Sequence, residues 1–230
     1  MRDTPEALML FAAGFGTRMG ALTRSRPKPL VEVAGRPLID HALDLVTPLR
    51  LPRVVANLHY LPEQLAAHLS SKAVALSVEA PDILETGGGL RHALPLLGTG
   101  PVFTLNTDAV WHGENPLQTL LTQWEPDRMD ALLICIPKTQ AVGHKGAGDF
   151  ILDETGRAAR GPGLIYGGAQ IIKTDLLSEV EDSVFSLNLL WDRMLETGRL
   201  YGAQYGGAWC DVGHPQGIID AEEMIGYRHV

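Results

Sequence analysis

The chain has few of the features that mark disulfide-rich, membrane or secreted proteins. It contains only two cysteines in 230 residues, so a disulfide framework is not what stabilises it. It has no run of eighteen apolar residues, and therefore no predicted membrane helix. Acidic residues precede the first apolar stretch and no small-residue cleavage site follows, which argues against a secretory signal. We expect a cytoplasmic protein with no membrane partner.

An excess of positive charge is also missing. The formal net charge is −8, which disfavours a long nucleic-acid surface because such surfaces need clustered cations. The segment between Glu6 and Glu32 is nevertheless free of acids and holds four cations: Arg18, Arg24, Arg26 and Lys28. One concentrated cationic segment in an acidic protein suits a small polyanion, although a solvated basic loop would look the same.

Apolar runs and helical spacing alternate along the first 140 residues. Buried strands are predicted at 7–12, 53–57, 74–78, 101–105 and 131–136, and helices at 37–46, 62–69, 89–97 and 116–124. This alternation indicates a parallel sheet covered by helices on both faces.

The pattern changes after about residue 140. We expect a hairpin that starts at 150–152, a strand at 164–172, a helix through 187–195 and a closing helix from Pro215. No composition shift marks a linker. The predicted fold is therefore a single α/β domain over 1–230, a Rossmann-like α/β/α sandwich with a mixed, mostly parallel sheet and a small inserted lobe.

The first apolar strand is followed by a glycine-containing loop, Ala12 to Met19, that continues to Pro27-Lys28-Pro29-Leu30. Glycines allow a backbone to turn tightly and to bring N–H groups against phosphate oxygens. An arginine can fork onto a polyphosphate, and a lysine can place a point charge beside a phosphorus. A dinucleotide fingerprint would need glycine where Met19 stands, and a Walker loop would need Gly-Lys-Ser/Thr, which is absent.

Two aspartates follow apolar segments far apart in the sequence. Asp108 ends the string Asn106-Thr107-Asp108, and Asp211 lies in Trp209-Cys210-Asp211-Val212-Gly213-His214-Pro215. In open α/β sheets, ligands bind beyond the carboxyl ends of the strands. Two such carboxylates suit a hard cation, whereas a lone aspartate at a strand end is more often a turn former.

The string from Ala12 to Leu30, including Leu22-Thr23, resembles the signature of the sugar-1-phosphate nucleotidyltransferases. The resemblance implies the nucleotide-diphospho-sugar transferase fold, a nucleotide-binding half over about 1–140 and a sugar-binding, closing half over about 141–230. It also implies that Asp108 and Asp211 hold Mg²⁺. Four positions depart from the pattern of this family: Ala21, Thr107, His214 and, as a neutral change, Phe11.

The same resemblance assigns roles to further residues. Arg18 would stabilise the leaving group and Lys28 the α-phosphoryl group. Glu79 would accept from the base edge, which fits uracil, thymine or guanine. The expected nucleotide-binding residues are Ala12, Ala13, Gly14, Phe15, Gly16, Thr17, Glu79, Thr86, Gly87 and Gly88, and the expected sugar-binding residues are Asn106, Gly148 and Asp149.

Within that family, the strings Leu84 to Gly89 and Ala93 to Gly98 are similar to those of N-acetylmuramate 1-phosphate uridylyltransferases of peptidoglycan recycling. This chain and those uridylyltransferases also share the lack of a Glu-Lys-Pro motif. This subgroup implies UTP and N-acetylmuramate 1-phosphate as substrates, for a monomer or small homo-oligomer.

Other functions remain open at this point. A mannose or glucose 1-phosphate nucleotidyltransferase, or a choline-phosphate cytidylyltransferase, would share the fold. A catalytically inactive, nucleotide-sugar-binding regulatory subunit is the alternative of another class, but it has no need for both carboxylates. A dinucleotide-dependent oxidoreductase is disfavoured by Met19.

Overall fold

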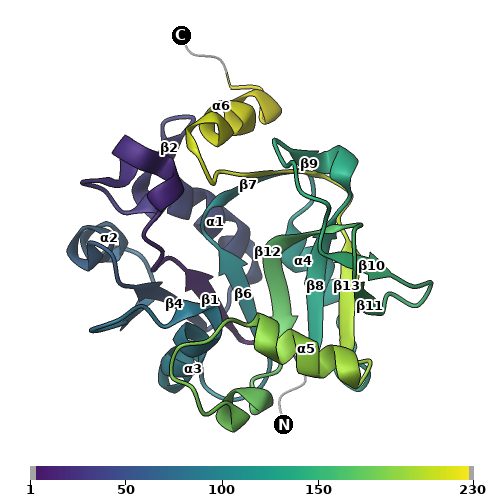
Figure 1. Cartoon of the computed structure of the whole chain (residues 1–230). Helices are drawn as coiled ribbons and strands as arrows, with labels where there is room; N and C mark the ends of the chain where they lie inside the picture. The colour runs from purple at the N-terminus through teal and green to yellow at the C-terminus, as the bar shows by residue number, and fades with distance from the viewer. Residues whose placement is uncertain (1–3, 228–230) are drawn as a thin grey trace.

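A seven-stranded sheet runs through the centre of the computed structural model, which describes residues 4–227 (Figure 1). The strand order is β13 (Leu200–Gln204), β8 (Ala131–Ile136), β12 (Ile165–Ile172), β6 (Val102–Asn106), β1 (Ala7–Phe11), β4 (Arg53–Leu58) and β5 (Ala75–Val78). Only β12 runs antiparallel to its neighbours, β6 and β8. The predicted mixed, mostly parallel sheet is therefore confirmed. Residues 1–3, which begin the stretch used above against a secretory signal, lie outside the described residues.

Helices cover both faces of this sheet because alternate side chains of its strands point to opposite sides. Leu8 and Leu10 of β1 pack in one cluster with residues of α1 (Leu38–Val46), α2 (Pro62–Leu69) and α4 (Pro116–Gln123). Met9 packs on the other face with residues of α3 (Glu85–Leu97) and α5 (Asn188–Glu196). In Figure 1, α3 and α5 lie at the end of the molecule opposite to α6 (Pro215–Met224).

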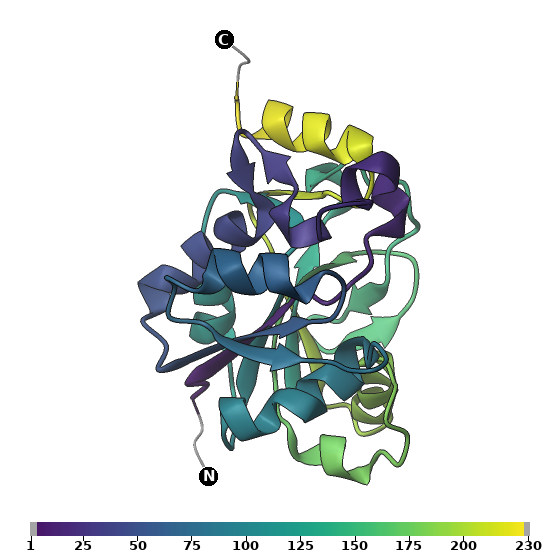
Figure 2. The same ribbon diagram turned by 90° about the vertical axis from the view of Figure 1, so that its left-hand side faces the viewer.

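Three smaller sheets complete the fold. β10 (Phe150–Leu152) and β11 (Ala158–Arg160) form the predicted hairpin. β14 (Ala208–Asp211) pairs with β7 (Ala109–His112) and β9 (Ala141–Val142), and β2 (Glu32–Val33) pairs with β3 (Arg36–Pro37). The short 3-10 helices are η1 (Thr17–Thr23), η2 (Lys28–Leu30), η3 (Thr47–Leu49), η4 (Lys138–Gln140) and η5 (Asp175–Glu179). Figure 2 shows η1 between α2 and α6.

One predicted boundary is wrong. α3 begins at Glu85, four residues before the predicted start at Gly89. Three consecutive glycines are poor helix formers, which is why the pattern suggested a later start. Gly87 and Gly88 are tolerated because they pack closely against the chain: their N–H groups lie 2.8 and 3.1 Å from the carbonyl oxygen of Phe185.

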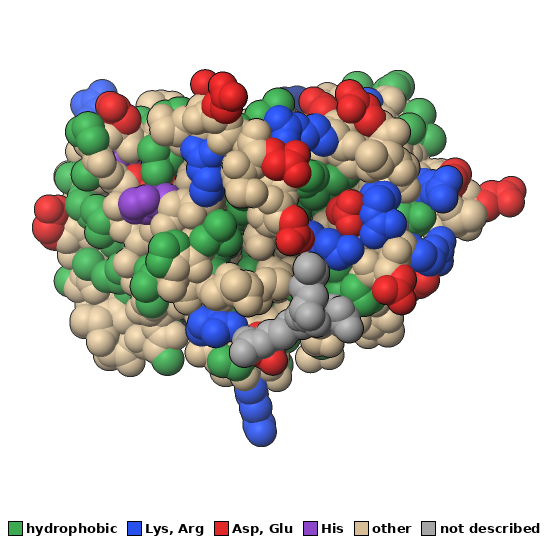
Figure 3. Space-filling view, turned by 90° about the horizontal axis from the view of Figure 1, so that it is seen from below, with side chains coloured by type: hydrophobic (Ala, Val, Ile, Leu, Met, Phe, Trp, Pro, Cys, Tyr) green, Lys and Arg blue, Asp and Glu red, His purple; other side chains and the backbone are tan. Residues whose placement is uncertain are grey.

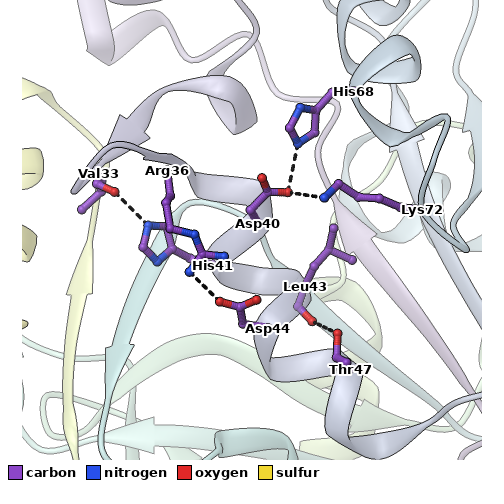
Figure 4. A network of polar contacts seen from close by, with 9 residues as sticks. All are labelled: Val33, Arg36, Asp40, His41, Leu43, Asp44, Thr47, His68 and Lys72. Atoms are coloured by element: carbon purple, nitrogen blue, oxygen red, sulfur yellow. Dashed lines mark hydrogen bonds and ion pairs between the residues drawn. The ribbon is translucent and has the colours of Figure 1, made fainter.

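Polar contacts join α1 to its surroundings (Figure 4). Asp40 of α1 pairs with His68 of α2 at 2.9 Å and with Lys72 at 3.0 Å. Arg36 and Asp44 form an exposed ion pair at 2.7 Å. The first contact joins α1 to α2, and the second joins α1 to the segment that follows α2.

The surface carries both signs of charge. On the face shown in Figure 3, basic side chains lie beside acidic ones, with hydrophobic side chains between them. Within residues 4–227, none of the helices has the length and apolar character needed to cross a membrane.

Candidate active site

A cavity of about 210 Å³ opens at the carboxyl ends of β1 and β6. These strands are neighbours, with Phe11 opposite Asn106, so the segments that follow them lie side by side. The sheet thus brings the predicted segments after β1 and β6 to one place, whereas residues 209–215, the third predicted segment, are not among those that line this cavity. The walls are formed by Phe11, Ala12, Ala13, Gly14, Lys28, Pro29, Asn57, Ile83, Glu85, Thr86, Asn106, Thr107 and Asp108.

The glycine-containing loop folds back tightly onto Lys28. Gly16 has a φ of 64°, and a Cβ there would lie 2.9 Å from Cβ of Lys28, so a side chain would be strained at this position. The hydroxyl of Thr23 donates to the carbonyl of Gly16 at 2.9 Å. The loop therefore holds Lys28 against the cavity.

The segment after the loop is hydrogen-bonded to α2 and to the residues just before it. The hydroxyl of Tyr60 donates to the carbonyl of Thr23 at 2.9 Å, and the side-chain amide of Gln64 donates to the carbonyl of Ser25 at 3.0 Å. Phe15 packs edge-on against His59, with ring centroids 5.3 Å apart. These contacts fix the path of the cationic segment.

Lys28 and Asp108 form a close ion pair. Nζ of Lys28 lies 2.6 Å from Oδ2 of Asp108, and the lysine side chain is only 10% exposed. A mostly buried ammonium beside a carboxylate is a fixed positive charge at the cavity wall. A phosphate group entering the cavity would meet both partners.

Asp211 reaches the same place from β14. It pairs with Ala109 in the ladder between β14 and β7, and the N–H of Val212 donates to the carbonyl of Asp108 at 2.8 Å. A Cβ at Gly213 would lie 2.8 Å from Oδ2 of Asp211 and 3.0 Å from Nη1 of Arg18. Arg18 and Asp211 therefore flank Gly213.

The electrostatic setting of Asp211 fits a bound cation. Burial raises the pKa of this carboxyl, the charge of Asp108 raises it further, and Lys28, Arg18 and His214 offset part of the effect. Two neighbouring carboxylates in a partly buried position favour a divalent cation, which lowers their mutual repulsion. The described residues contain no cluster of three or more His, Cys, Asp or Glu side chains that could hold a metal. A cation on this pair would therefore take its other oxygens from phosphate and water.

Other predicted residues take different positions. Glu79 was expected at the base edge, but it is 2% exposed and absent from the cavity wall. Its Oε1 accepts from Asn57 at 2.7 Å and its Oε2 accepts from the N–H of Leu84 at 2.8 Å. The predicted base contact therefore does not fit this arrangement. Glu79 instead orients Asn57, which does line the cavity.

The glycines of α3 also lie away from the cavity. Gly87 and Gly88 give their N–H groups to Phe185, so only Thr86 of the predicted trio is on the wall. Ala12 lies on the wall, but its N–H donates to Oδ1 of Asn57 at 2.7 Å. Phe15, Gly16 and Thr17 lie beyond the residues that line the cavity.

Thr107 replaces the usual glycine of the family without disturbing the site. Its side chain is turned back into the fold, where the hydroxyl donates to the carbonyl of Phe11 at 2.8 Å. The residue is 2% exposed. His214, the other departure near an aspartate, caps α6 by accepting from the N–H of Gly217.

A second cavity of about 280 Å³ shares Phe11, Thr86 and Asn106 with the first. Of the predicted sugar-binding residues, Asn106 and Asp149 line it. Gly148 instead packs against the backbone of Gly163. A Cβ at position 148 would lie 2.3 Å from the carbonyl oxygen of Gly163. The remaining lining residues are Phe150, Arg160, Tyr166, Ser186, Leu187, Asn188 and Trp191.

Most of the residues that line the second cavity were not predicted from the sequence. Trp191 was predicted to be core, and it is 6% exposed, yet it also forms part of the wall. Arg160 and Asn188 belong to no local motif, because the hairpin and α5 meet only in the folded chain. The only available signal was the change of pattern after residue 140.

Comparison with known proteins decides the family. Residues 8–182 match the MobA-like NTP transferase domain. The chain belongs to this family. The MobA-like relatives include the N-acetylmuramate alpha-1-phosphate uridylyltransferase of Caulobacter vibrioides, 39% identical over 98% of this chain and 99% of that protein. A protein of the same name from Neisseria meningitidis is 31% identical over 95% and 97%.

More distant relatives carry names with other substrates. A probable mannose-1-phosphate guanylyltransferase of Arabidopsis thaliana is 29% identical over 92% of this chain, which covers 62% of that protein. The predicted resemblance to sugar-1-phosphate nucleotidyltransferases is confirmed, and so is the expected likeness to the uridylyltransferases. The chain is thus a nucleotidyltransferase by family.

Solved structures confirm the fold. HddC from Yersinia pseudotuberculosis, complexed with GMP-PN, superposes with a TM-score of 0.77 at 17% identity, covering 94% of this chain and 98% of that one. A putative glucose-1-phosphate thymidylyltransferase from Bacillus anthracis gives 0.76 at 15% identity, covering 97% and 96%. The nucleotide-diphospho-sugar transferase fold is therefore the fold of this chain.

Proposed function

We propose that this protein transfers the uridylyl group of UTP to N-acetylmuramate 1-phosphate, in the cytoplasm, as a step of peptidoglycan recycling. The observation that supports the reaction is the meeting of four charged side chains: Lys28 and Asp108 form an ion pair on the wall of the first cavity, and the charges of both, with that of Arg18, act on Asp211. Similarity over the full chain to two uridylyltransferases supports the substrates.

The chemistry is an in-line displacement. An oxygen of the sugar phosphate attacks the α-phosphorus of UTP, the bond from that phosphorus to the β-bridging oxygen breaks, and pyrophosphate leaves. The attacking phosphate is already ionised, so the step needs no general base. Catalysis then consists of positioning and of charge stabilisation.

The protein supplies fixed positive charge around the reacting phosphorus. Lys28, held on Asp108 at 2.6 Å, lies at the cavity wall where the α-phosphoryl group would bind. Arg18, which with Asp211 flanks Gly213, would contact the departing pyrophosphate. Ala13 and Gly14 line the cavity, and we infer that their N–H groups would bind phosphate oxygens.

Asp108 and Asp211 would hold Mg²⁺, which when bound supplies positive charge to the phosphate oxygens as charge develops there. The sugar ring would occupy the second cavity, beside Asn106 and Asp149. This leaves the nucleotide in the first cavity, beside Thr86 and Asn57.

The test is a product screen with four nucleoside triphosphates and the 1-phosphates of N-acetylmuramate, N-acetylglucosamine, glucose and mannose. Pyrophosphate release is the readout, with and without EDTA. We expect the highest kcat/KM for UTP with N-acetylmuramate 1-phosphate, and loss of turnover in EDTA. A clearly higher kcat/KM for mannose or glucose 1-phosphate would reject the substrate, while the family would stand.

A further inference from the structure

One positively charged side chain that lines the second cavity has no assigned role. Of the described residues that line it, Arg160 at the end of β11 is the only lysine or arginine. Its side chain is 40% exposed. Lys28 and Asp108, where the sugar phosphate would react, line only the first cavity. Arg160 therefore lies on a wall away from the reacting phosphorus.

The guanidinium of Arg160 is held in one orientation by α5. Its Nη2 donates to Oδ1 of Asn188 at 2.8 Å and to Oδ1 of Asp192 at 2.7 Å, and its Nε donates to the same aspartate oxygen at 3.2 Å. The group also lies over the rings of Phe150 and Trp191, 4.9 and 5.8 Å from their centroids. A planar cation fixed on two aromatic faces loses little freedom when it binds a ligand.

These contacts leave one nitrogen of the fork unused. Nη1 of Arg160 has no hydrogen-bond partner among residues 4–227. Asp192 is 59% exposed, so water screens its charge. Asp149, the acid on the cavity wall, has Oδ2 turned to the N–H of Tyr166 at 2.8 Å. Nη1 is thus a preorganised, charged donor for an anionic acceptor in the cavity.

We propose that Arg160 binds the carboxylate that distinguishes N-acetylmuramate 1-phosphate from sugar 1-phosphates whose sugar carries no charge. This inference rests on the proposed function, because that substrate carries a lactyl ether with an ionised carboxyl group. Arg160 is then a specificity-determining residue, and it makes no contact with the reacting phosphorus. A charge-assisted hydrogen bond of this kind discriminates strongly against an analogue without the acceptor.

The experiment compares three acceptors with UTP: N-acetylmuramate 1-phosphate, its lactyl amide, and N-acetylglucosamine 1-phosphate. The variants are Arg160→Met, which keeps apolar packing on the rings, and Arg160→Lys. The matched control is Arg157→Met in the same hairpin, because Arg157 bonds the hydroxyl of Tyr201 and lies outside both cavity walls. KM for UTP and the melting temperature of each variant report folding.

For Arg160→Met we expect kcat/KM with N-acetylmuramate 1-phosphate to fall roughly ten- to a hundredfold, mainly through KM. The value for N-acetylglucosamine 1-phosphate should not change. Wild type should discriminate against the lactyl amide, whereas Arg160→Met should not. Arg160→Lys should restore part of the preference, and Arg157→Met should behave as wild type.

Equal losses for all three acceptors would overturn the inference, since they would mean that Arg160 binds the shared phosphate or only supports the fold. Unchanged kinetics would overturn it as well. If wild type fails to use N-acetylmuramate 1-phosphate but uses another acceptor, the proposed function fails and this inference fails with it. The two failures are distinguishable. A failure of the proposed function is visible in the wild-type enzyme, whereas a failure of this inference alone is visible only in the Arg160 variants.

Discussion

Arg18 makes the sharpest prediction at the scale of a residue. It is expected to contact groups whose charge grows as pyrophosphate leaves, so it should stabilise the transition state more than the ground state. Removal of such a donor costs about 2.7–4 kcal/mol, roughly a hundred- to a thousandfold in kcat. Arg18→Ala should therefore lower kcat far more than it weakens UTP binding, as measured by steady-state kinetics and titration calorimetry.

Arg26 provides the control for that experiment. It lies in the same cationic segment but is exposed, 4.0 Å from Glu32, and should change neither quantity much when replaced by alanine. Arg18→Lys should rescue incompletely, because a point charge does not reproduce a fork. An equal loss of affinity and kcat/KM in Arg18→Ala, with kcat unchanged, would indicate a nucleotide binder instead.

The two carboxylates make a second prediction. Asp108→Asn and Asp211→Asn each remove a charge that would hold the cation while keeping size and shape. Each should lose on the order of a hundredfold in kcat at low Mg²⁺ while the melting temperature stays close to wild type. The measurement is a Mg²⁺ titration of turnover for each variant. Full activity of a variant at low Mg²⁺ would remove that residue from the metal site.

Residue roles were predictable from the sequence where a motif is contiguous. Lys28 and Asp108 meet as expected, because the segments that follow the neighbouring strands β1 and β6 lie side by side. Asp211, the last residue of β14, comes near them because β14 pairs with β7, which begins directly after Asp108. Glu79 was misjudged, since its spacing matches a base contact but a buried amide and a backbone N–H engage both of its oxygens. Arg160 could not be found, because what places it is contact with α5.

At the scale of an element, the path of the cationic segment depends on α2 and the turn that leads into it. Tyr60 bonds the carbonyl of Thr23, midway between Arg18 and Lys28. Tyr60→Phe removes that contact and keeps the ring that packs on Phe15. Small displacements of catalytic groups are costly, so we expect kcat to fall several-fold, up to about a hundredfold. Thermal unfolding should change little.

Steady-state kinetics beside a thermal melt separates positioning from folding in this variant. A lower melting temperature with unchanged kcat would show that Tyr60 only stabilises the fold. Unchanged values of both would show that Gln64, which bonds Ser25, is sufficient to hold the segment.

Elements of the central sheet were easier to predict than those around it. The five predicted strands of the first half agree with the structure to within one residue at each end. Four of them are largely buried apolar runs, whereas the edge strand β5 is partly exposed. The ladder of β14 with β7 and β9 was not predicted. β9 has two residues, and the register between β14 and β7 joins residues about a hundred positions apart. Local patterns do not encode such pairings.

At the scale of the whole molecule, Asp130 joins three strands of the sheet. It precedes β8 and pairs with Lys173 after β12 at 3.0 Å and with Arg199 before β13 at 2.8 Å. Burial acts to raise the pKa of this carboxyl, but hydrogen bonds from Arg199 and Lys173 outweigh it and hold the pKa below its usual value. The ion pairs of Asp130 with Lys173 and Arg199 therefore stabilise the folded state only while Asp130 is ionised.

The sign of the pH dependence follows. A carboxyl whose pKa is lowered by folding contributes stability above its unfolded pKa, about 3.9, and loses it as pH falls through the folded pKa. Asp130→Asn should cost about 1 kcal/mol of unfolding free energy at neutral pH. The difference from wild type should shrink below about pH 4. Urea unfolding at several pH values measures it.

Asp44→Asn is the matched control for Asp130. Asp44 of α1 is 59% exposed and pairs with Arg36 of β3 at the surface, so its replacement should change stability little at any pH. A difference between Asp130→Asn and wild type that stays constant down to pH 3 would contradict the assignment of that stability to the ionised carboxyl.

The central claim concerns which bond of UTP breaks and where its uridylyl group goes. The most direct measurement incubates enzyme, Mg²⁺ and N-acetylmuramate 1-phosphate with UTP radiolabelled at either the α- or the γ-phosphate. Attack at the α-phosphorus predicts that α-label appears only in the nucleotide sugar and γ-label only in pyrophosphate, with neither released when the acceptor is omitted. Label transfer from the γ-phosphate to the sugar, or α-label in UMP without acceptor, would contradict the account.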